Sequence, residues 1–400
     1  MKREPAQPKR RKSKLPASVL ALAAASFFND IGSEMGFPLL PVLLVSLGAG
    51  PAYLGIVEGI ADAVASLLKL AAGYLADRVG KSKPLVMFGY GLPCGVRPLL
   101  ALVTAPFQVL GIRVLDRVGK GLRTAPRDAL IAASVPRDQS GSAFGFHRTM
   151  DHAGGVLGPL IASGLLAFGF SIREVLLAAL IPSLMALVAV AWVREAPRAA
   201  PAGAPLHLPR PALPRSYRKF LAIMALFAVA NSSDAFLLLR ASEVGVSTAS
   251  LPLMWTALHL SRMASTYLGG HLADRFSRAR LIALGWLVFA LCYLGMGAAS
   301  EAWHAWALFM VYGAHTGLCE PAERALIRDL APEATRGRAF GLFHGVVGAC
   351  AIPAGLGMGW LWQVWSAQVA LTFAAILAVV AALALLLWDR ELKDRAAPVD

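Results

Sequence analysis

The best candidates for functional chemistry in this sequence are the charged side chains within its long apolar stretches. Asp30 and Glu34 stand four residues apart, with Ser33 and Phe37 on the same helical face. A charged group at the centre of a lipid bilayer costs about 2.5–3.5 kcal/mol or more unless it is paired or hydrated. Two carboxylates one turn apart also raise each other's proton affinity. The pair therefore predicts proton coupling or a place on a substrate cavity, with a permanent bridge to nearby cations as the structural alternative.

The segment 107–134 carries an unusual excess of positive charge. Asp116 and Asp128 are its only acids, whereas its basic residues follow one helical stripe or its margin: Arg113, Arg117, Lys120, Arg123 and Arg127. A helix with this many cations cannot face lipid. We expect the stripe to line a cavity or to meet the acids of segments 17–46 and 302–330.

Acidic residues occupy the corresponding stripe of segment 302–330. Ala-Leu-Ile follows both Asp128 and Arg324, and aligning these copies places Glu323 opposite Arg127, with Glu320 one turn before Arg324. Because the two stripes have opposite charge, they are expected to face each other across a pseudo-twofold axis. This predicts either a salt-bridge gate between two halves or a binding site for a substrate that bears both charges.

Three further groups have weaker signals. Asn231 and Asp234 share a face of segment 217–244 and are expected to line the same cavity as Asp30 and Glu34. Glu58, Asp62 and Lys69 lie on one face of segment 51–77, where a structural bridge and a cavity role are equally compatible with the pattern. Trp255, Trp360 and Trp362 are expected to be core or interface aromatics.

A duplicated phrase indicates how the chain positions these groups. Gly-x-Leu-Ala-Asp-Arg occurs twice, 197 residues apart, and the two copies contain Gly73, Asp77, Arg78, Gly80 and Lys81 in the first and Gly270, Asp274 and Arg275 in the second. A repeated loop implies a repeated half. We expect Asp77 to hold the two halves together on one side of the membrane, with simple marking of an inside loop as the alternative.

Composition places the chain in lipid. Hydrophobic residues make up 57% of it and charged residues 16%, with a mean hydropathy of +0.60, whereas soluble domains carry about 25% charged residues. The candidate helices are roughly 17–46, 51–77, 83–104, 107–134, 140–168, 172–193, 217–244, 250–274, 279–299, 302–330, 337–362 and 366–388. The fold class predicted is an all-α membrane protein with twelve transmembrane helices in two pseudo-symmetric bundles of six.

The basic residues predict the topology. They concentrate in the N-terminal tail and in the loops after even-numbered helices, so the positive-inside rule puts both termini and the central linker in the cytoplasm. The expected parts are a basic tail (1–16), an N-terminal bundle (17–193), a linker (194–216), a C-terminal bundle (217–389) and a second tail (390–400). The net charge of +14 is spread over loops, which disfavours nucleic-acid binding and permits contact of the tail with anionic membrane lipid.

The four cysteines, Cys94, Cys292, Cys319 and Cys350, are isolated in apolar segments and lack the spacing of a disulfide frame or a metal site. No set of nucleophile, base and orienting residue is present, and no phosphate-binding loop. The sequence thus predicts no enzyme activity, no cofactor and no metal.

The duplicated phrase and two further motifs resemble the major facilitator superfamily over essentially the whole chain. Residues 113–121 are similar to the family's arginine-containing motif in the fourth helix. Gly154, Gly158 and Pro159 partly match the fifth-helix motif of its proton antiporters, whose full form has a further glycine pair where this chain has only Gly164. Residues 231–240 and 320–326 resemble a bacterial and archaeal branch of the family whose members are mostly uncharacterised.

The resemblance implies a monomeric secondary transporter of the cell inner membrane, working by alternating access with helices 1, 4, 7 and 10 around the path. It implies a small-molecule substrate and coupling to protons. The fifth-helix motif slightly favours export, whereas the cations of segment 107–134 favour uptake of an organic anion. A non-transporting sensor or scaffold on the same fold is the alternative from another functional class.

Overall fold

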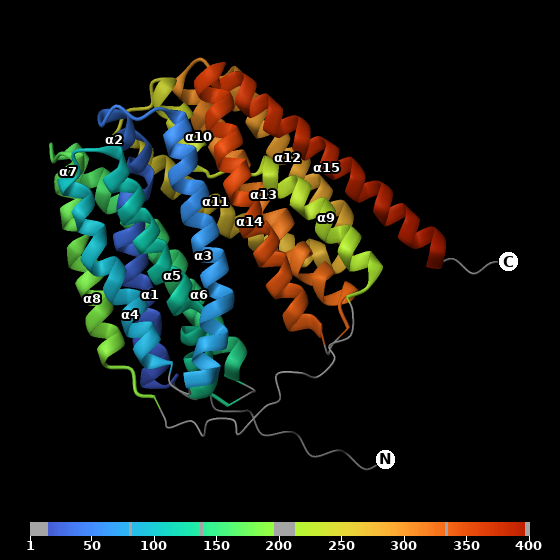
Figure 1. The fold of residues 1–400 in the computed structure, drawn as a ribbon, viewed down its shortest axis with the longest axis horizontal. Coiled ribbons are helices and arrows are strands. Elements are labelled where there is room, and N and C mark those ends of the chain that lie inside the picture. Colours follow the sequence, from blue (N-terminus) through green and yellow to red (C-terminus); the bar gives the residue numbers. More distant parts are fainter. Residues whose placement is uncertain (1–14, 80–81, 137–138, 196–212, 333–334, 397–400) are drawn as a thin grey trace, which may run out of the picture.

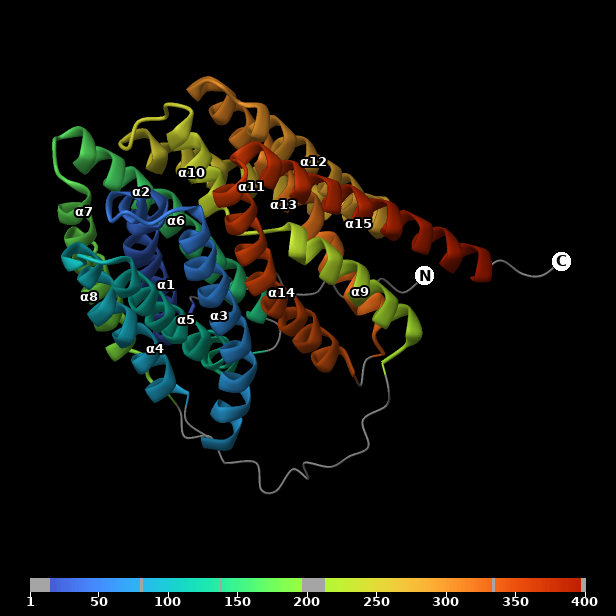
Figure 2. The same ribbon diagram turned by 45° about the horizontal axis from the view of Figure 1, so that its top comes forward.

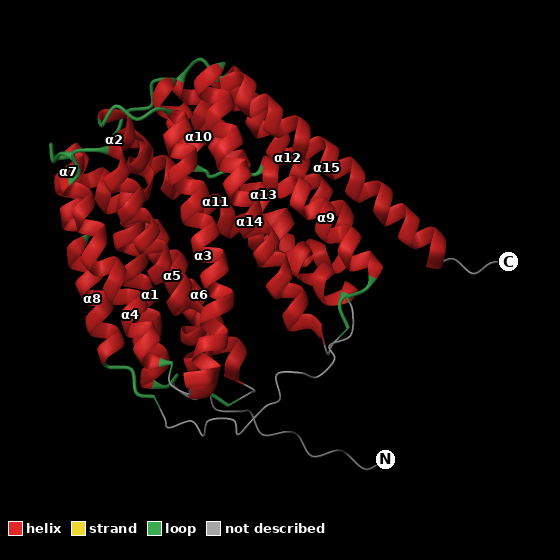
Figure 3. Ribbon diagram, viewed as in Figure 1, coloured by secondary structure: helices red, strands yellow, loops and turns green. Residues whose placement is uncertain are grey.

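Helices make up the regular structure of this protein. The computed structural model describes residues 15–79, 82–136, 139–195, 213–332 and 335–396, and within these ranges Figure 3 shows only helices and connecting loops. The helical segments follow the apolar runs of the sequence, because a helix satisfies all its backbone hydrogen bonds internally where no water is available. The expected all-α class is confirmed.

The first half of the chain contains three interrupted rods and three continuous ones. Its elements are α1 (Ala17–Gly36), η1 (Phe37–Leu39), α2 (Leu40–Ser46), α3 (Pro51–Val79), α4 (Lys83–Val96), η2 (Arg97–Leu102), α5 (Pro106–Ser134), α6 (Ser140–Ala167), α7 (Ile172–Ala178) and α8 (Leu180–Ala191). Pro38 and Pro41 fall at the short 3₁₀ turn between α1 and α2. Proline removes a backbone donor, so the first rod changes its geometry just beyond Glu34.

The second half contains one interrupted rod, formed by α9 and α10, and five continuous ones. Its elements are α9 (Arg215–Ala230), α10 (Ala235–Glu243), α11 (Ser250–Arg275), α12 (Arg278–Ala298), α13 (Ala302–Leu330), α14 (Arg336–Val364) and α15 (Ala367–Ala396). The sequence predicted one continuous helix over 217–244. The structure instead breaks it at Asn231, whose φ of −83° and ψ of 78° end α9.

The two halves lie side by side and converge at one end. Figures 1 and 2 show α1–α8 on one side and α9–α15 on the other, meeting near the loops 47–50 and 244–249 and diverging where α8 ends and α9 begins. We call the first end the far side and the second the linker side. The central cavity described below is therefore closed by both halves on its far side.

Glycines close the far side. A Cβ atom on Gly55 of α3 would collide with the carbonyl oxygen of Gly355 of α14, and one on Gly359 would lie 2.9 Å from the Cα atom of Ala52. Small residues allow two helix backbones to approach this closely. The glycines therefore make a tight seam between the halves at the far-side end of α3. The predictions from the sequence did not include this seam.

Charged residues occur on rods of different hydropathy. Within the described ranges, seven helical segments are long and apolar enough, by length and composition, to cross a membrane. The other rods include α5, α6, α11 and α13. The charged residues considered above lie on both kinds of rod: Arg117 is on α5, whereas Glu58 and Asp62 are on α3, which is one of the seven. Helices with such residues are expected to turn them toward a polar cavity and away from lipid.

Candidate functional site

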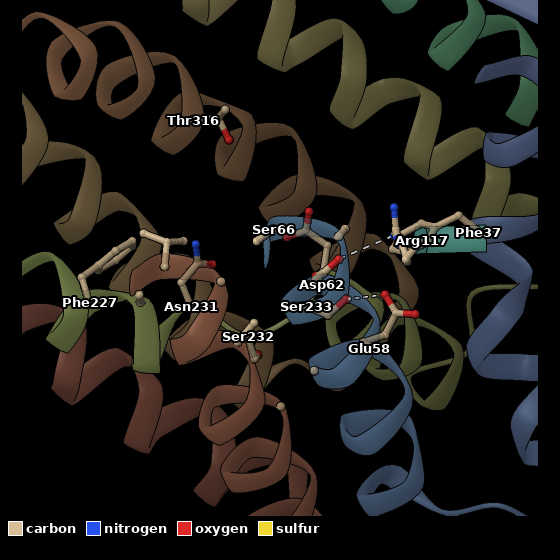
Figure 4. Close-up of a pocket in the computed structure, with 18 of the residues that line it drawn as sticks. Phe37, Glu58, Asp62, Ser66, Arg117, Phe227, Asn231, Ser232, Ser233 and Thr316 are labelled. Carbon is tan, nitrogen blue, oxygen red and sulfur yellow. Dashed lines mark hydrogen bonds and ion pairs between the residues drawn. The ribbon is translucent and has the colours of Figure 1, made fainter. Parts of the chain in front are cut away.

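A central cavity of about 520 Å³ lies between the halves (Figure 4). One wall comes from α1, α3 and α5, and the other from α9, the break between α9 and α10, α11, α13 and α14. The charged residues that line it are Glu34, Glu58, Asp62, Lys69, Arg117, Lys120, Asp234, Arg262 and Glu323. A polar cavity enclosed by apolar helices is the type of place where a solute is bound within a membrane.

Glu58 forms a buried ion pair with Arg113. The Arg113 guanidinium donates to one Glu58 oxygen from Nη2 at 2.6 Å and from Nε at 3.0 Å, and the Glu58 residue is only 1% exposed. The other Glu58 oxygen accepts a hydrogen bond of 3.2 Å from the Ser233 hydroxyl of the opposite half, as Figure 4 shows. This carboxylate thus connects α3, α5 and the break between α9 and α10.

The cations of α5 meet acids in their own half. Asp116 accepts a bond of 2.7 Å from Arg97, and Arg117 lies 3.7 Å from Asp62 (Figure 4). We expected the cations of α5 to line a cavity or to meet acids of the first and tenth helices. Arg117 and Lys120 line the central cavity, whereas Arg113 and Arg117 meet acids of α3 and not those of the first and tenth helices. The reason is that α5 packs directly on α3, where a Cβ on Gly121 would lie 2.6 Å from the Leu68 side chain.

The spacing of these acids and arginines in the sequence could have predicted that they pair between α3 and α5. Glu58 and Asp62 are one turn apart, as are Arg113 and Arg117, so two packed helices can match both pairs. Of the two alternatives for Glu58 and Asp62, bridging is observed for both, and both also line the cavity.

Glu34 contacts the opposite half. The indole nitrogen of Trp255 on α11 donates to Glu34 Oε2 at 2.8 Å, and His259 Nε2 lies 3.8 Å from the same oxygen. Asp30 instead accepts a hydrogen bond of 2.9 Å from the neighbouring Asn29. Neither carboxylate forms an ion pair with a cation of α5 among the described residues, so the permanent bridge considered for them is not present here.

Asp234 organises the second wall of the cavity. It accepts a bond of 2.6 Å from Arg262 and one of 2.8 Å from the Tyr312 hydroxyl. The Arg262 guanidinium also lies 5.6 Å from the ring centre of Trp255 and 5.7 Å from that of Tyr312. Asn231 lines the same cavity. The sequence pattern predicted Asn231 and Asp234 at this cavity but not Arg262, a single arginine in the middle of α11.

Arg123 and Arg127 are engaged within the first half. Arg123 donates to the Gly89 carbonyl at 3.1 Å, and Arg127 bonds Asp128 at 3.0 Å and the Ser26 hydroxyl at 3.1 Å. Glu320 pairs with Arg324 at 3.2 Å. The structure therefore does not bring these arginines to Glu320 or Glu323. The halves diverge on the linker side, so a bridge formed when that side closes stays a prediction.

The glycines of the fifth-helix motif determine how closely α6 packs. A Cβ on Gly154 would lie 3.0 Å from the Cβ of Asp30, and one on Gly158 would lie 2.5 Å from the Ile31 carbonyl oxygen. Pro159 continues the motif inside α6. The next position, Gly155, faces the His259 ring. The motif thus holds α1, with its carboxylates, against α6 and brings α6 close to α11.

The two signature loops are only partly visible. The side chains of Asp77 and Arg78 and the surroundings of Gly73 lie outside the described part of α3, as do Gly80 and Lys81 entirely. In the second copy Asp274 and Arg275 are exposed at the end of α11, and a Cβ on Gly270 would meet nothing within 4 Å. The role expected for Asp77 therefore stays a prediction.

Comparisons with known proteins agree with this architecture. The model of the Major Facilitator Superfamily matches residues 22–258 and 220–398. An uncharacterized MFS-type transporter of Methanocaldococcus jannaschii is 31% identical over 93% of this chain and 95% of its own length. The multi-drug resistance efflux pump PmrA of Streptococcus pneumoniae is 26% identical, covering 79% of this chain and 82% of the pump.

Solved structures share the fold. A POT family transporter in complex with 5-aminolevulinic acid superposes with a TM-score of 0.80 at 13% identity, over 96% of this chain and 98% of that one. A bacterial homolog of the human lysosomal transporter Spinster, in an inward-facing and unoccupied conformation, gives 0.75 at 15% identity, over 97% of this chain and all of that one. At these identities the likeness concerns the fold alone.

Proposed function

Because this chain belongs to the Major Facilitator Superfamily, a family of transporters and not of enzymes, we propose that it is a proton-coupled exporter of a small organic solute. It acts in the cytoplasmic membrane, with both termini and the linker inside the cell. On this orientation the linker side faces the cytoplasm, and the observed conformation is inward-open. The solute enters the central cavity from the cytoplasm and leaves when the far side opens.

The contact of Glu34 with the opposite half is the observation that carries the proton coupling. Its carboxylate accepts the Trp255 N–H at 2.8 Å and lies near His259, both on α11. Hydrogen bonds to an ionised acceptor are about twice as strong as neutral ones. A proton on Glu34 removes that charge and weakens a connection that holds the far side closed. Proton binding and the change of access are thereby linked at one side chain.

Export has independent support. The relative named as a multi-drug resistance efflux pump, PmrA of Streptococcus pneumoniae, is similar along 79% of this chain. The fifth-helix glycines, which partly match an antiporter motif, lie against Asp30 and next to His259. The motif therefore packs against α1, the helix that carries Glu34, to which we assign the proton.

Uptake of an organic anion is the second candidate. It is favoured by Lys69 and Lys120, which line the cavity without a hydrogen bond or ion pair to another described residue. The two candidates differ in the direction of the proton relative to the solute.

Proteoliposomes with a trapped pH-sensitive dye distinguish them. Compounds that raise the melting temperature of the purified protein are added outside, and uptake of each compound and luminal pH are recorded together. Antiport predicts that solute entry makes the lumen more alkaline, and symport predicts that it becomes more acidic. In Glu34→Gln, proton movement should be lost while exchange of labelled for unlabelled solute continues, because exchange needs no net proton transfer.

Three results would contradict parts of this proposal. Solute entry without any pH change removes proton coupling. Loss of exchange in Glu34→Gln, together with driven flux, assigns Glu34 to binding or folding. A compound that binds but never crosses the membrane favours the sensor or scaffold.

A further inference from the structure

The cavity charges divide into paired and unpaired groups. Glu58, Asp62 and Asp234 each have an arginine partner within 3.7 Å. Lys69, Lys120 and Glu323 line the same cavity, but none forms a hydrogen bond or ion pair with any residue in the described ranges. Three charges in one cavity are thus without a direct protein partner in this conformation.

The unpaired charges are arranged by sign. Lys69 on α3 and Lys120 on α5 belong to the first half, whereas Glu323 on α13 belongs to the second. Lys120 lies within electrostatic range of Lys69 and Arg117 and also of Asp30 and Glu34. The first wall as a whole is balanced, with three acids and three bases, but its two groups without a hydrogen bond or ion pair are both cations. An uncompensated charge in a membrane cavity is costly unless water or a ligand satisfies it. The two walls therefore offer sites of opposite sign to one occupant.

Apolar side chains also line the second wall. Met224 and Phe227 of α9 and Phe343 and Val347 of α14 line the same cavity. A ligand that fits has an apolar portion in addition to its charges, because apolar lining contributes affinity and a few polar groups contribute orientation.

We propose, building on the transport function inferred above, that the cavity binds a small zwitterionic molecule with an apolar portion. Its anionic group lies between Lys69 and Lys120, and its cationic group lies on Glu323. A ligand with both charges compensates both walls at once, which lowers the cost of bringing the halves together on the linker side. A ligand with one charge leaves the opposite wall uncompensated and closes the linker side less well.

Equilibrium binding to the purified full-length chain in nanodiscs tests this assignment. The probes are aromatic amino acids and alanyl-phenylalanine, each in three forms: free, N-acetylated to remove the cation, and amidated at the carboxyl group to remove the anion. The free forms should bind at least about tenfold more tightly than both blocked forms, as expected for the loss of one charge-assisted contact.

Variants assign each contact. Glu323→Gln should weaken binding of the free probe about tenfold and leave that of the N-acetylated probe unchanged. Lys69→Gln and Lys120→Gln should weaken the free probe similarly and leave the amidated probe unchanged. The matched controls are Glu301→Gln, an exposed acid next to the first residue of α13, and Lys83→Gln, whose ammonium donates to the Ala191 carbonyl; both should bind as the wild type does.

Several outcomes overturn the proposal. Equal affinity for the free and N-acetylated forms makes the site an anion site, and failure of every free probe to bind at millimolar concentration rejects the class. Variants that change the conformational balance but not the preference for free probes show that the three charges form only a gate. Because binding is measured without a gradient, failure of proton coupling would leave these results unaffected.

Discussion

At the level of residues, the far side of the cavity depends on buried ion pairs. Glu58 and Arg113 are both less than a tenth exposed and share two short hydrogen bonds. Ser233 adds a bond from the other half. Removing one member of such a pair leaves a buried charge without compensation, whereas removing both can be nearly neutral. Breaking the Glu58–Arg113 pair should therefore cost more stability than the intact pair contributes.

A double-mutant cycle on this pair measures that asymmetry. Arg113→Gln or Glu58→Gln alone should destabilise the protein by about 3–5 kcal/mol, and the double variant should cost less than the sum. The measurement is thermal unfolding in detergent, with Glu301→Gln, an exposed acid, as the control. Additive effects would show that the two side chains do not depend on each other.

The second prediction at this level concerns the N–H donor of the Trp255 indole ring. Trp255→Phe keeps an aromatic ring beside Phe37, 4.8 Å away, but removes the donor to Glu34. Loss of a hydrogen bond to a charged group costs about 1.5–3 kcal/mol, so the far-side-closed population should decrease. This population is measured from the distance between spin labels at Ala133 and Arg328, which lie at the linker-side ends of α5 and α13.

Trp286→Phe is the matched control for this change, because the Trp286 N–H is buried and has no hydrogen-bond partner in the described structure. It should leave the label distances as they are. If the two variants behave alike, the Glu34 contact does not hold the halves together.

At the level of elements, close helix packing joins the halves. The backbones of α3 and α14 approach at Gly55 and Gly355, and α6 approaches α11, where Ser163 donates to the Ala249 carbonyl at 2.7 Å. Both approaches are on the far side. Motions that open the far side must separate these helices there, while their linker-side ends come together.

Gly55→Ala tests the seam between α3 and α14. The added methyl group would meet the Gly355 carbonyl oxygen, so the helices must move apart at the far side. We expect a shorter Ala133 to Arg328 label distance, as the balance moves toward a closed linker side. Gly357→Ala on α14 is the control, since a Cβ there meets nothing within 4 Å. A label distance that Gly55→Ala leaves unchanged would mean that the seam tolerates separation.

At the level of the whole molecule, the positive charges of the loops predict its orientation. The linker and both tails should be cytoplasmic, and the loops of the far side extracellular. A cysteine placed at Gly50 should react with a membrane-impermeant reagent in intact cells, and one at Ala202 should react only after the membrane is broken. Reaction at Ala202 but not at Gly50 in intact cells would reverse the orientation and, with it, the assignment of the conformation as inward-open.

The sequence by itself determined the all-α fold class and indicated a duplicated chain with α5 turned away from lipid, but the four helices that it placed around the path omitted α3, α11 and α14, which also line the cavity. The fold class and the placement of α5 follow from single-residue energetics, because an apolar run of sufficient length must span lipid and a charged helix such as α5 must avoid it. Helix breaks were harder to predict from the sequence. Pro38 and Pro41 indicate the first break, but no comparably strong signal indicates the break at Asn231.

Only the tertiary structure decided which charges meet. Arg113 had acids available on several helices, and its choice of Glu58 depends on the packing of α5 against α3. Glu34 lies next to Trp255, 221 residues away, because α1, α6 and α11 pack through small residues. In this conformation Glu58 pairs with Arg113 and accepts a hydrogen bond from Ser233 of the other half, whereas Lys69, Lys120 and Glu323 line the cavity without a hydrogen bond or ion pair to a described residue, because helix packing decides which side chains come within reach of one another.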